Sequence, residues 1–260
     1  MGAVATTDDG ATSRFCVCDR DFGVASFSAA SGRRDWHVTN HVRDAYLVAG
    51  GPRSKFVVVC SGEKASGLSL HAPEDGRMVS YSAGPNWCWG GSDSEVVIGI
   101  PGGLYYGPLT LALTRVQLPL HRHFRIGDFE IGQRISFSHR TIAIGLAGSY
   151  VKLIDKQTGR ELWHTELPPG SLTAIAHCAE LGAVLAVMDT PEDKEKVGLY
   201  KFDLANGRMS PYRPDGIPDW SDCNGVFADH GRRLILFSGF VVDTVSGAAV
   251  PIDVDACFEP

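Results

Sequence analysis

The hydrophobic pattern of this chain consists of short apolar runs, each preceded by a charged residue. The runs follow Arg14, Lys55, Glu95, Arg140, Glu180 and Arg233. No stretch keeps the helical period of about 3.6 residues, and many of the segments between these runs alternate polar and apolar residues. Short apolar runs bounded by Gly and polar residues are typical of β-strands, so we predict strands throughout the chain.

A second motif, a small or polar residue followed by Gly, recurs at the predicted hairpin turns. Its occurrences are Ser31-Gly32, Asp75-Gly76, Thr158-Gly159, Asn206-Gly207 and Ser246-Gly247. The Gly residues are 44, 83, 48 and 40 positions apart, and 83 is close to twice the usual interval. Strand repeats of this length are typical of a β-propeller.

The sequence therefore predicts an all-β fold, a single six-bladed β-propeller of four-stranded antiparallel blades in one domain. We expect the blades at about 14–39, 44–82, 86–120, 134–166, 172–213 and 223–253. The first repeat lacks its inner strand in this interpretation, because residues 1–13 are small and polar. We expect the tail 254–260 to complete the first blade, so that N- and C-terminal strands pair and close the ring.

Three of the turns also place an Asp four residues before the Gly. The pairs are Asp155 with Gly159, Asp203 with Gly207, and Asp243 with Gly247. We expect each Asp to accept hydrogen bonds from amides of the turn, and each Gly to supply a positive φ.

Trp36 and Trp163 each follow a turn Gly by four residues. The segment 155–163 resembles a repeat of the quinoprotein-like and WD-repeat-like β-propeller superfamily, with the pattern Asp-x-x-Thr-Gly-x-x-x-Trp. The resemblance implies that Trp163 and Trp36 are structural wedges between blades. The quinone-dependent dehydrogenases of that group are larger, exported and calcium-bound, whereas this chain has too few repeats and no adjacent cysteine pair. We therefore expect no cofactor.

Charge and hydropathy narrow the classes of partner. The net charge of −6 argues against a nucleic-acid partner, because phosphate binding needs a basic surface. The apolar runs are far shorter than the roughly 20 residues that cross a bilayer, so we expect no membrane contact. The N-terminus has no apolar core of a signal peptide, which predicts a cytoplasmic protein with its seven cysteines reduced.

The longer and chemically more varied connections fall on one side of the predicted blades. In an antiparallel four-stranded blade, the connection between the second and third strands lies on the same side as the connection to the next blade. We call this side the binding side, because long varied loops usually carry function. The candidate partner-binding residues there are Tyr105, Tyr106, His121, Arg122, His123, Phe124, Arg125, Glu192, Asp193, Asp219, Trp220 and Asp222.

Two functions remain open from the sequence. The first is a non-enzymatic protein-binding propeller, one version being a cognate inhibitor or immunity protein of a bacterial toxin. The second is a metal-dependent hydrolase or lactonase of the six-bladed type, which needs Glu, Asp and Asn side chains around a central ion. Its inner-strand candidates are few: Asp44, Asn86 and Asn224. The alternating His121 and His123 and the pair Cys16 and Cys18 lack a companion ligand cluster, so we expect no metal site and no catalytic residues.

Overall fold

The computed structural model describes slightly more than two thirds of the chain. The described residues are 4–8, 13–19, 23–28, 33–38, 45–49, 57–61, 67–83, 87–92, 95–100, 103–108, 110–112, 115–117, 124–128, 130, 133–189, 197–214, 226–228, 234–237 and 240–251. All described strand pairs are antiparallel, which confirms the all-β prediction. None of the described segments is a helix long and apolar enough to cross a bilayer.

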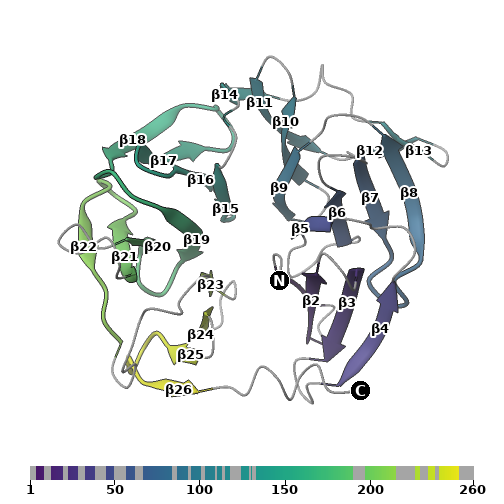
Figure 1. The fold of residues 1–260 in the computed structure, drawn as a ribbon. Coiled ribbons are helices and arrows are strands. Elements are labelled where there is room, and N and C mark those ends of the chain that lie inside the picture. The colour runs from purple at the N-terminus through teal and green to yellow at the C-terminus, as the bar shows by residue number, and fades with distance from the viewer. Residues whose placement is uncertain are drawn as a thin grey trace. The chain divides into compact units, whose positions relative to one another are not determined.

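The chain forms two compact units, Met1–Phe129 and Glu130–Pro260. The first unit contains three four-stranded sheets and a short hairpin among its described residues (Figure 1). Sheet 1 has the order β1 (Val4–Asp8), β2 (Ser13–Asp19), β3 (Gly23–Ser28) and β4 (Arg34–Val38). Sheet 2 consists of β5 (Ala45–Ala49), β6 (Val57–Ser61), β7 (Gly67–His71) and β8 (Met78–Ala83). Sheet 3 consists of β9 (Trp87–Ser92), β10 (Glu95–Ile100), β11 (Gly103–Pro108) and β14 (Phe124–Gly127). The strands β12 (Thr110–Ala112) and β13 (Arg115–Gln117) form the separate hairpin.

The second unit contains three further four-stranded sheets in its described part. Sheet 4 consists of β15 (Arg134–Phe137), β16 (Thr141–Leu146), β17 (Tyr150–Asp155) and β18 (Glu161–Glu166). Sheet 5 consists of β19 (Leu172–Cys178), β20 (Ala183–Asp189), β21 (Val197–Asp203) and β22 (Met209–Pro211). Sheet 6 consists of β23 (Val226–Ala228), β24 (Leu234–Phe237), β25 (Phe240–Asp243) and β26 (Ala249–Pro251).

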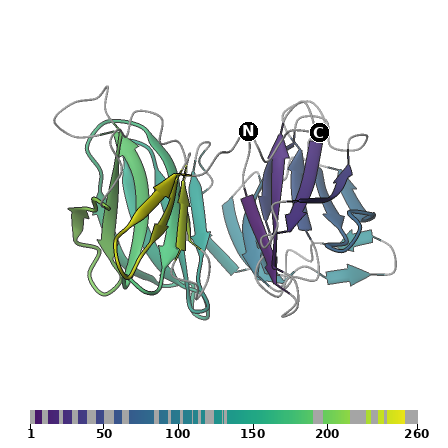
Figure 2. The ribbon, with the colours of Figure 1, turned by 90° about the horizontal axis from the view of Figure 1, so that it is seen from below.

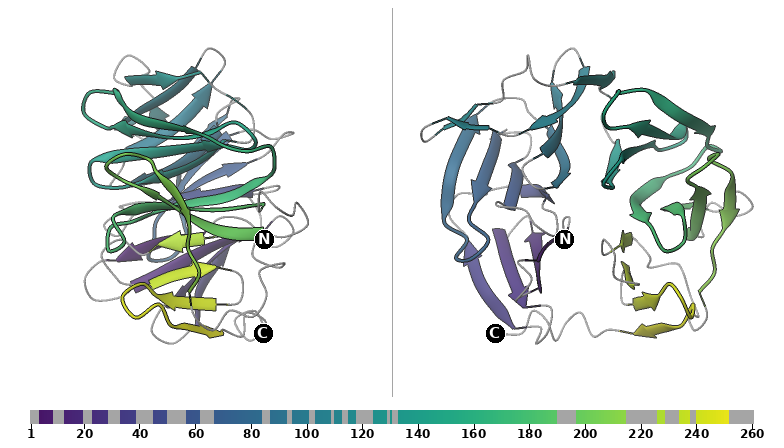
Figure 3. Two further views of the ribbon diagram at one scale, coloured as in Figure 1. Left: turned by 90° about the vertical axis from the view of Figure 1, so that its left-hand side faces the viewer. Right: turned by 180° about the vertical axis from the view of Figure 1, so that it is seen from behind.

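Successive sheets of one unit meet through their first strands. In the first unit β5 lies beside β1 and β2 on one side and beside β9 on the other, and in the second unit β19 lies between β15 and β23 (Figure 1). Within each unit taken by itself, the strands of successive sheets run in roughly the same direction (Figure 2). The three sheets of the second unit follow one another from teal to yellow in the left panel of Figure 3. We call the contact between two successive sheets of a unit a joint.

The second strands read as continuous apolar runs, and in sheet 5 the reason is that a joint with sheet 4 covers one face and a joint with sheet 6 covers the other. In β20, every residue from Ala183 to Met188 is buried, and in β16 the four residues from Ile142 to Gly145 are buried. A strand packed on both sides reads as a continuous hydrophobic run rather than an alternating one. This is why these strands were recognisable in the sequence.

The Asp–Gly turns are closed by hydrogen bonds within the turn. Asp155 Oδ1 accepts the amide N–H groups of Gln157 (3.0 Å) and Thr158 (2.8 Å) and the hydroxyl of Thr158 (2.8 Å). The Gly159 N–H donates to the Asp155 carbonyl at 2.9 Å. These hydrogen bonds to Thr158 lower the pKa of Asp155 below its ordinary value. Asp203 and Asp243 form the same turn in sheets 5 and 6.

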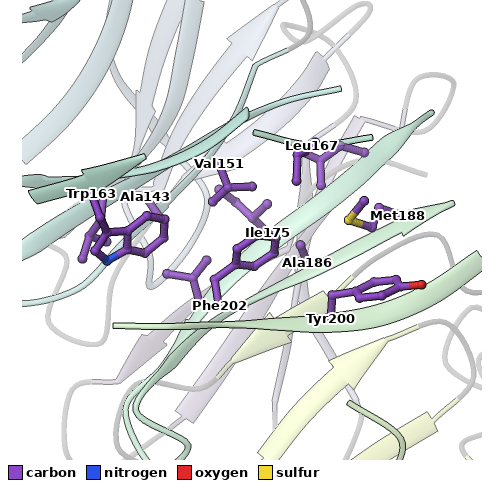
Figure 4. Packing of buried hydrophobic residues seen from close by; sticks show 12 residues of the cluster. Ala143, Val151, Trp163, Leu167, Ile175, Ala186, Met188, Tyr200 and Phe202 are labelled. Atoms are coloured by element: carbon purple, nitrogen blue, oxygen red, sulfur yellow. The ribbon is translucent and has the colours of Figure 1, made fainter. Parts of the chain in front are cut away.

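At two joints a Trp of one sheet lies on the turn of the next. Trp163 on β18 donates its indole N–H to the Leu204 carbonyl at 3.0 Å, and Trp36 on β4 donates to the Pro73 carbonyl at 2.8 Å. The indole of Trp163 also stacks on Phe202, inside the hydrophobic cluster between sheets 4 and 5 (Figure 4). The outer strands β18 and β4 are thereby attached to the neighbouring sheet.

The inner part of the joint between sheets 4 and 5 also contains a polar network. His177 on β19 is buried, and its main-chain N–H donates to Ser136 Oγ on β15 at 2.9 Å. Its ring Nε2 lies 3.0 Å from Thr141 Oγ1, which lies 2.8 Å from Ser138 Oγ. These bonds satisfy polar groups that would otherwise be unpaired in the core, and so they stabilise the joint.

The first sheet corrects the prediction for its inner strand. Residues 4–8 form β1, which pairs with β2 from Val4 opposite Val17 to Asp8 opposite Ser13. The inner place is therefore held by the N-terminal segment and not by the tail, and the tail 254–260 lies outside the described residues. The prediction failed because strand pairing uses backbone groups, which small and polar residues such as Thr6 and Thr7 supply equally well. Closure of one ring of six blades stays a prediction.

The third sheet corrects the prediction for its outer strand. We expected the third blade to end at about residue 120, but its outer strand is β14 (Phe124–Gly127), which pairs with β11. Residues 110–112 and 115–117 form a separate hairpin, which lies between the third and fourth strands of sheet 3 in the sequence. This insertion explains why the turn glycine expected here is absent, and it places Phe124 and Arg125 on a strand rather than in a loop.

Candidate functional site

Tyr105 and Arg125, two of the candidate partner-binding residues, lie together on sheet 3. Tyr105 on β11 is directly opposite Arg125 on the outer strand β14. Residues opposite each other in an antiparallel pair present their side chains on the same face. A Cβ placed on Gly103 would lie 3.0 Å from Arg125 Nε and 3.2 Å from the Tyr105 ring, so both side chains border the small surface of this Gly.

An exposed ion pair holds one side of this site. The Arg125 guanidinium donates to the Asp128 carboxylate three residues later in the chain. The side chain of Arg125 is 57 % exposed and that of Asp128 is 83 % exposed. Surface ion pairs contribute little to stability, so these charges are free to contact a partner at small cost to the fold. We call Tyr105, Arg125 and Asp128 the edge site.

Tyr106 does not belong to this surface. It lies next to Tyr105 on β11, and its side chain therefore points to the other face of the sheet. Only 5 % of Tyr106 is exposed. This residue is part of the core, and its assignment as a partner-binding residue is corrected.

Of the other candidate residues, only Phe124 lies in the described part of the chain. Phe124 lies on β14 opposite Tyr106. The residues that fall outside the described part of the chain are His121, Arg122, His123, Glu192, Asp193, Asp219, Trp220 and Asp222. Their place on the binding side stays a prediction.

The structure places a polar cluster on sheet 4 that the sequence did not suggest. Gln133 Nε2 donates to the Tyr150 hydroxyl at 2.9 Å, and this hydroxyl donates to Glu130 Oε1 at 3.4 Å. Gln133 is fully buried, and its Oε1 has no hydrogen-bond partner among the described residues. Burial is the main cause that raises the pKa of Tyr150 above its ordinary value. Lys152 Nζ lies 4.8 Å from the centre of the Tyr150 ring.

No sequence signal would have found this cluster. Gln133 and Tyr150 are 17 residues apart and belong to no recognisable motif. Their contact passes across β16, because Gln133 directly precedes β15 and Tyr150 lies on β17, on the other side of β16. The cluster is mostly closed to solvent and stabilises the start of β15.

Metal ligation has little support in the described part of the chain. Within it, no group of three or more His, Cys, Asp or Glu residues is arranged to hold an ion. Cys16 is buried as a free thiol, and Cys178 is another. Burial raises the pKa of Cys178, which disfavours the thiolate that binds metals. Asp44, Asn86 and Asn224, the inner-strand candidates of a hydrolase, lie outside the described residues.

Comparison with known proteins identifies the fold but no family. No protein-family model matches the sequence, and no curated protein matches it. Solved structures do match. A hydrazine synthase of Kuenenia stuttgartiensis gives a TM-score of 0.62 at 16 % identity, covering 92 % of this chain and 76 % of that one.

Two further structures are similar at comparable identity. U3-55K gives a TM-score of 0.57 at 12 % identity, covering 90 % of this chain and 72 % of its own. The computationally designed protein Ika8 gives 0.54 at 13 % identity, covering 95 % and 72 %. The hydrazine synthase and U3-55K are β-propeller proteins. The likeness extends to the fold alone, so this chain has a fold of the β-propeller type.

Proposed function

We propose that this chain is a non-enzymatic binding protein whose edge site contacts a protein partner. The pairing of Tyr105 with Arg125 on the outer part of sheet 3 supports this proposal most directly. Tyr and Arg are the residue types most enriched at the energetic centres of protein interfaces. The β-propeller fold is consistent with this role but does not decide it, since one fold carries many functions.

A narrower version is a cognate inhibitor of a bacterial toxin. The net charge of −6 favours a partner with a basic surface, because complementary charge speeds association and fixes orientation. The predicted loop residues Glu192, Asp193, Asp219 and Asp222 would add acidic groups to the same binding side. The partner in this version is a single protein bound in a fixed ratio.

The experiment is a capture from the native host followed by a measured affinity. We expect the tagged chain to recover one protein in a stoichiometric amount. Arg125→Glu reverses the charge at the edge site, and we expect it to weaken binding of the purified partner by at least tenfold in calorimetry, about 1.4 kcal/mol. Arg77→Glu is the matched control, because Arg77 is also exposed but lies in the turn of sheet 2 on the opposite side of the strands.

Two results would contradict the proposal. Equal affinity of the Arg125→Glu and unaltered chains would place the interface elsewhere. One tightly held calcium ion per purified chain, measured by elemental analysis, would instead support the metal-dependent hydrolase or lactonase.

A further inference from the structure

The outer strand of sheet 4, β18, has one edge that pairs with β17 and one edge that pairs with no described strand (Figure 1). The Leu167 N–H donates to the Ser149 carbonyl at 2.9 Å, and hydrogen-bonded pairs alternate along an antiparallel ladder. The main-chain N–H and C=O groups of Leu162, His164 and Glu166 therefore point away from β17. Among the described residues, no hydrogen bond reaches these groups. We call them the outward groups of β18.

The outer strands of sheets 5 and 6 are protected where β18 is not. β22 and β26 have three residues each and end at Pro211 and Pro251. The hydrogen bond from the Tyr212 N–H to the Leu199 carbonyl fixes the alternation in sheet 5 and makes Pro211 an outward residue, and Pro251 is outward in sheet 6 by the same alternation. A Pro has no N–H to donate, so it hinders pairing of an edge strand with another chain. β18 has six residues and no Pro.

The joint with sheet 5 holds β18 in place. Trp163 donates its indole N–H to the Leu204 carbonyl at 3.0 Å, and Thr165 Oγ1 donates to the Gly207 carbonyl at 2.8 Å. Both bonds are on the joint face of the strand and leave its outer edge unchanged. The outward groups are therefore held in an extended strand before a partner arrives, which lowers the entropy lost on binding.

The exposed side chains of β18 indicate which kind of strand would pair with it. Leu162 is 50 % exposed, and the side chains of His164 and Glu161 are 41 % and 51 % exposed. Glu161 and Glu166 are the acidic residues of the strand, which contains no Lys or Arg. Lys152 on β17 is opposite His164, but its ammonium lies over an aromatic ring of its own strand. A strand with basic residues at its ends and an apolar residue opposite Leu162 would complement this edge.

A second copy of β18 matches this edge less well. Each copy would bring two carboxylates to the strand pair and no Lys or Arg from the strand itself. Opposite charges across a strand pair are stabilising, whereas like charges are destabilising. The net charge of −6 likewise favours a basic partner over another copy of the chain.

We infer that β18 is a strand-addition site, which accepts an extended segment of a protein partner with Lys or Arg residues flanking an apolar centre. Main-chain hydrogen bonds to the outward groups provide affinity, and the carboxylates of Glu161 and Glu166 select the basic ends. This site lies in the second unit and is independent of the edge site. Its test needs no partner from the host, so its failure would leave the proposed function untouched.

The direct test measures amide hydrogen exchange in the full chain with the capped peptide Lys-Thr-Val-Thr-Val-Lys. Antiparallel pairing places its two Lys residues near Glu166 and Glu161. When the peptide occupies about nine-tenths of the chain, exchange of the Leu162, His164 and Glu166 amides should slow by about tenfold. The amides between these positions already bond to β17 and should change little. No binding up to about 5 mM peptide, or protection only elsewhere in the chain, would overturn the inference.

Two kinds of control peptide separate backbone pairing from charge. N-methylation of the third peptide residue removes an N–H that faces β18, and we expect it to weaken binding at least tenfold. N-methylation of the fourth residue, whose N–H points away from β18, should weaken binding by less than about threefold. Glu-Thr-Val-Thr-Val-Glu should bind at least tenfold more weakly than the Lys peptide. Equal effects of the two N-methyl groups would overturn the inference.

Substitutions assign the binding to β18. His164→Pro removes an outward N–H but no hydrogen bond to β17, and we expect it to abolish binding of the Lys peptide. The double substitution Glu161→Lys with Glu166→Lys should reverse the preference at least tenfold toward the Glu peptide, which decides the matter if the Pro variant does not fold. Glu74→Lys is the control, because Glu74 is an exposed carboxylate in the turn of sheet 2. It should leave binding unchanged.

Other occupants are detected by the same exchange measurement without peptide. Protection of the outward amides that grows with protein concentration, together with a dimer in analytical ultracentrifugation, would identify a second copy at β18. Protection of these amides in the dilute chain would show that another segment of the chain covers the edge. Either result would overturn the inference.

Discussion

Trp163 shows how a single side chain attaches an outer strand to the next sheet. Its ring lies parallel to that of Phe202, with centroids 6.4 Å apart and planes 11° apart, and its N–H is bonded to the Leu204 carbonyl. It therefore contributes both apolar burial and a directed hydrogen bond. We therefore expect substitution of Trp163 to lower the stability of the second unit strongly.

We predict that Trp163→Ala lowers the free energy of unfolding by about 3–5 kcal/mol, because it removes the aromatic ring from a packed joint. Trp163→Phe keeps part of the packing but leaves the Leu204 carbonyl without its donor, and a loss of about 1–3 kcal/mol is expected. Urea titration measures both. Leu162→Ala is the control at a half-exposed neighbour and should change stability by less than about 0.5 kcal/mol. An equal effect at positions 162 and 163 would contradict the wedge role.

Two tyrosines should respond oppositely to loss of the hydroxyl. The Tyr150 hydroxyl accepts the Gln133 amide, whereas the Tyr212 hydroxyl is buried without a partner among the described residues. We predict that Tyr150→Phe destabilises the protein by about 1–3 kcal/mol, since the buried Gln133 amide loses its acceptor. Tyr212→Phe should be neutral or stabilising by up to about 1 kcal/mol. Thermal unfolding at neutral pH distinguishes them, and a large loss in the Tyr212 variant would show a bond that the structure lacks.

Tyr212 should also contribute to alkaline unfolding. Burial is the main cause that raises its pKa above the ordinary value of 10.0, and the charges of Cys178 and Asp243 raise it further. As the pH rises through 10, the unfolded chain loses this proton before the folded chain does, so the free energy of unfolding falls. We predict that Tyr212→Phe makes this fall shallower in urea titrations between pH 8 and about 11. If Tyr212→Phe left the pH dependence of the free energy of unfolding unchanged, the raised pKa of Tyr212 would be contradicted.

At the scale of elements, the Asp–Gly turns are local structures that also carry long-range contacts. The backbone and the Asp side chain close the turn through bonds that span two to five residues. Gly207 has a φ of +72° and lies under the indole of Trp163, which is 44 positions earlier in the chain. Gly207 is thus needed both for the backbone conformation of the turn and for the contact with Trp163 at the joint.

A pair of Gly substitutions separates these two roles. Gly182 in the β19–β20 turn has a φ of +56°, but no described atom lies within 4 Å of a Cβ placed on it. We predict that Gly182→Ala costs about 1–2 kcal/mol, the strain of a left-handed L-residue. Gly207→Ala should cost more by at least about 1 kcal/mol, because its Cβ would displace the indole. Urea titration compares them, and equal costs would indicate that Trp163 moves aside freely.

At the scale of the whole molecule, deletions at the two ends of the chain test which segment holds the inner place of sheet 1. β1 pairs with β2 over five residues and holds the inner place of sheet 1. We predict that deletion of residues 2–8 lowers the melting temperature by more than 5 °C, since a loss of about 1 kcal/mol shifts it by roughly 2–4 °C in a chain of this size. Deletion of residues 254–260 should have a smaller effect in the same calorimetric scan. The reverse order would restore the tail to the inner strand.

Much of the fold could be predicted from the sequence, but less of the candidate site. The strands β17 and β18 lie within the predicted blade 134–166, and β20 lies within the predicted blade 172–213. Tyr105 and Arg125, which were assigned to loops on one side, lie opposite each other on β11 and β14, and their role in partner binding stays a prediction. The burial of Tyr106 was not foreseeable, because neighbouring Tyr residues in a strand point to opposite faces and the sequence does not say which face is covered.

Local sequence was sufficient to predict the β-strands and the Asp–Gly turns. These depend on side-chain alternation and on hydrogen bonds between residues a few positions apart, which local sequence specifies. Tertiary packing and strand pairing instead set that β1 completes sheet 1, that β14 and not the segment before it completes sheet 3, and that Trp163 covers the turn of sheet 5. Each of these is a choice among competing partners distant in the chain, and the choice is made by packing and backbone pairing that no local pattern encodes.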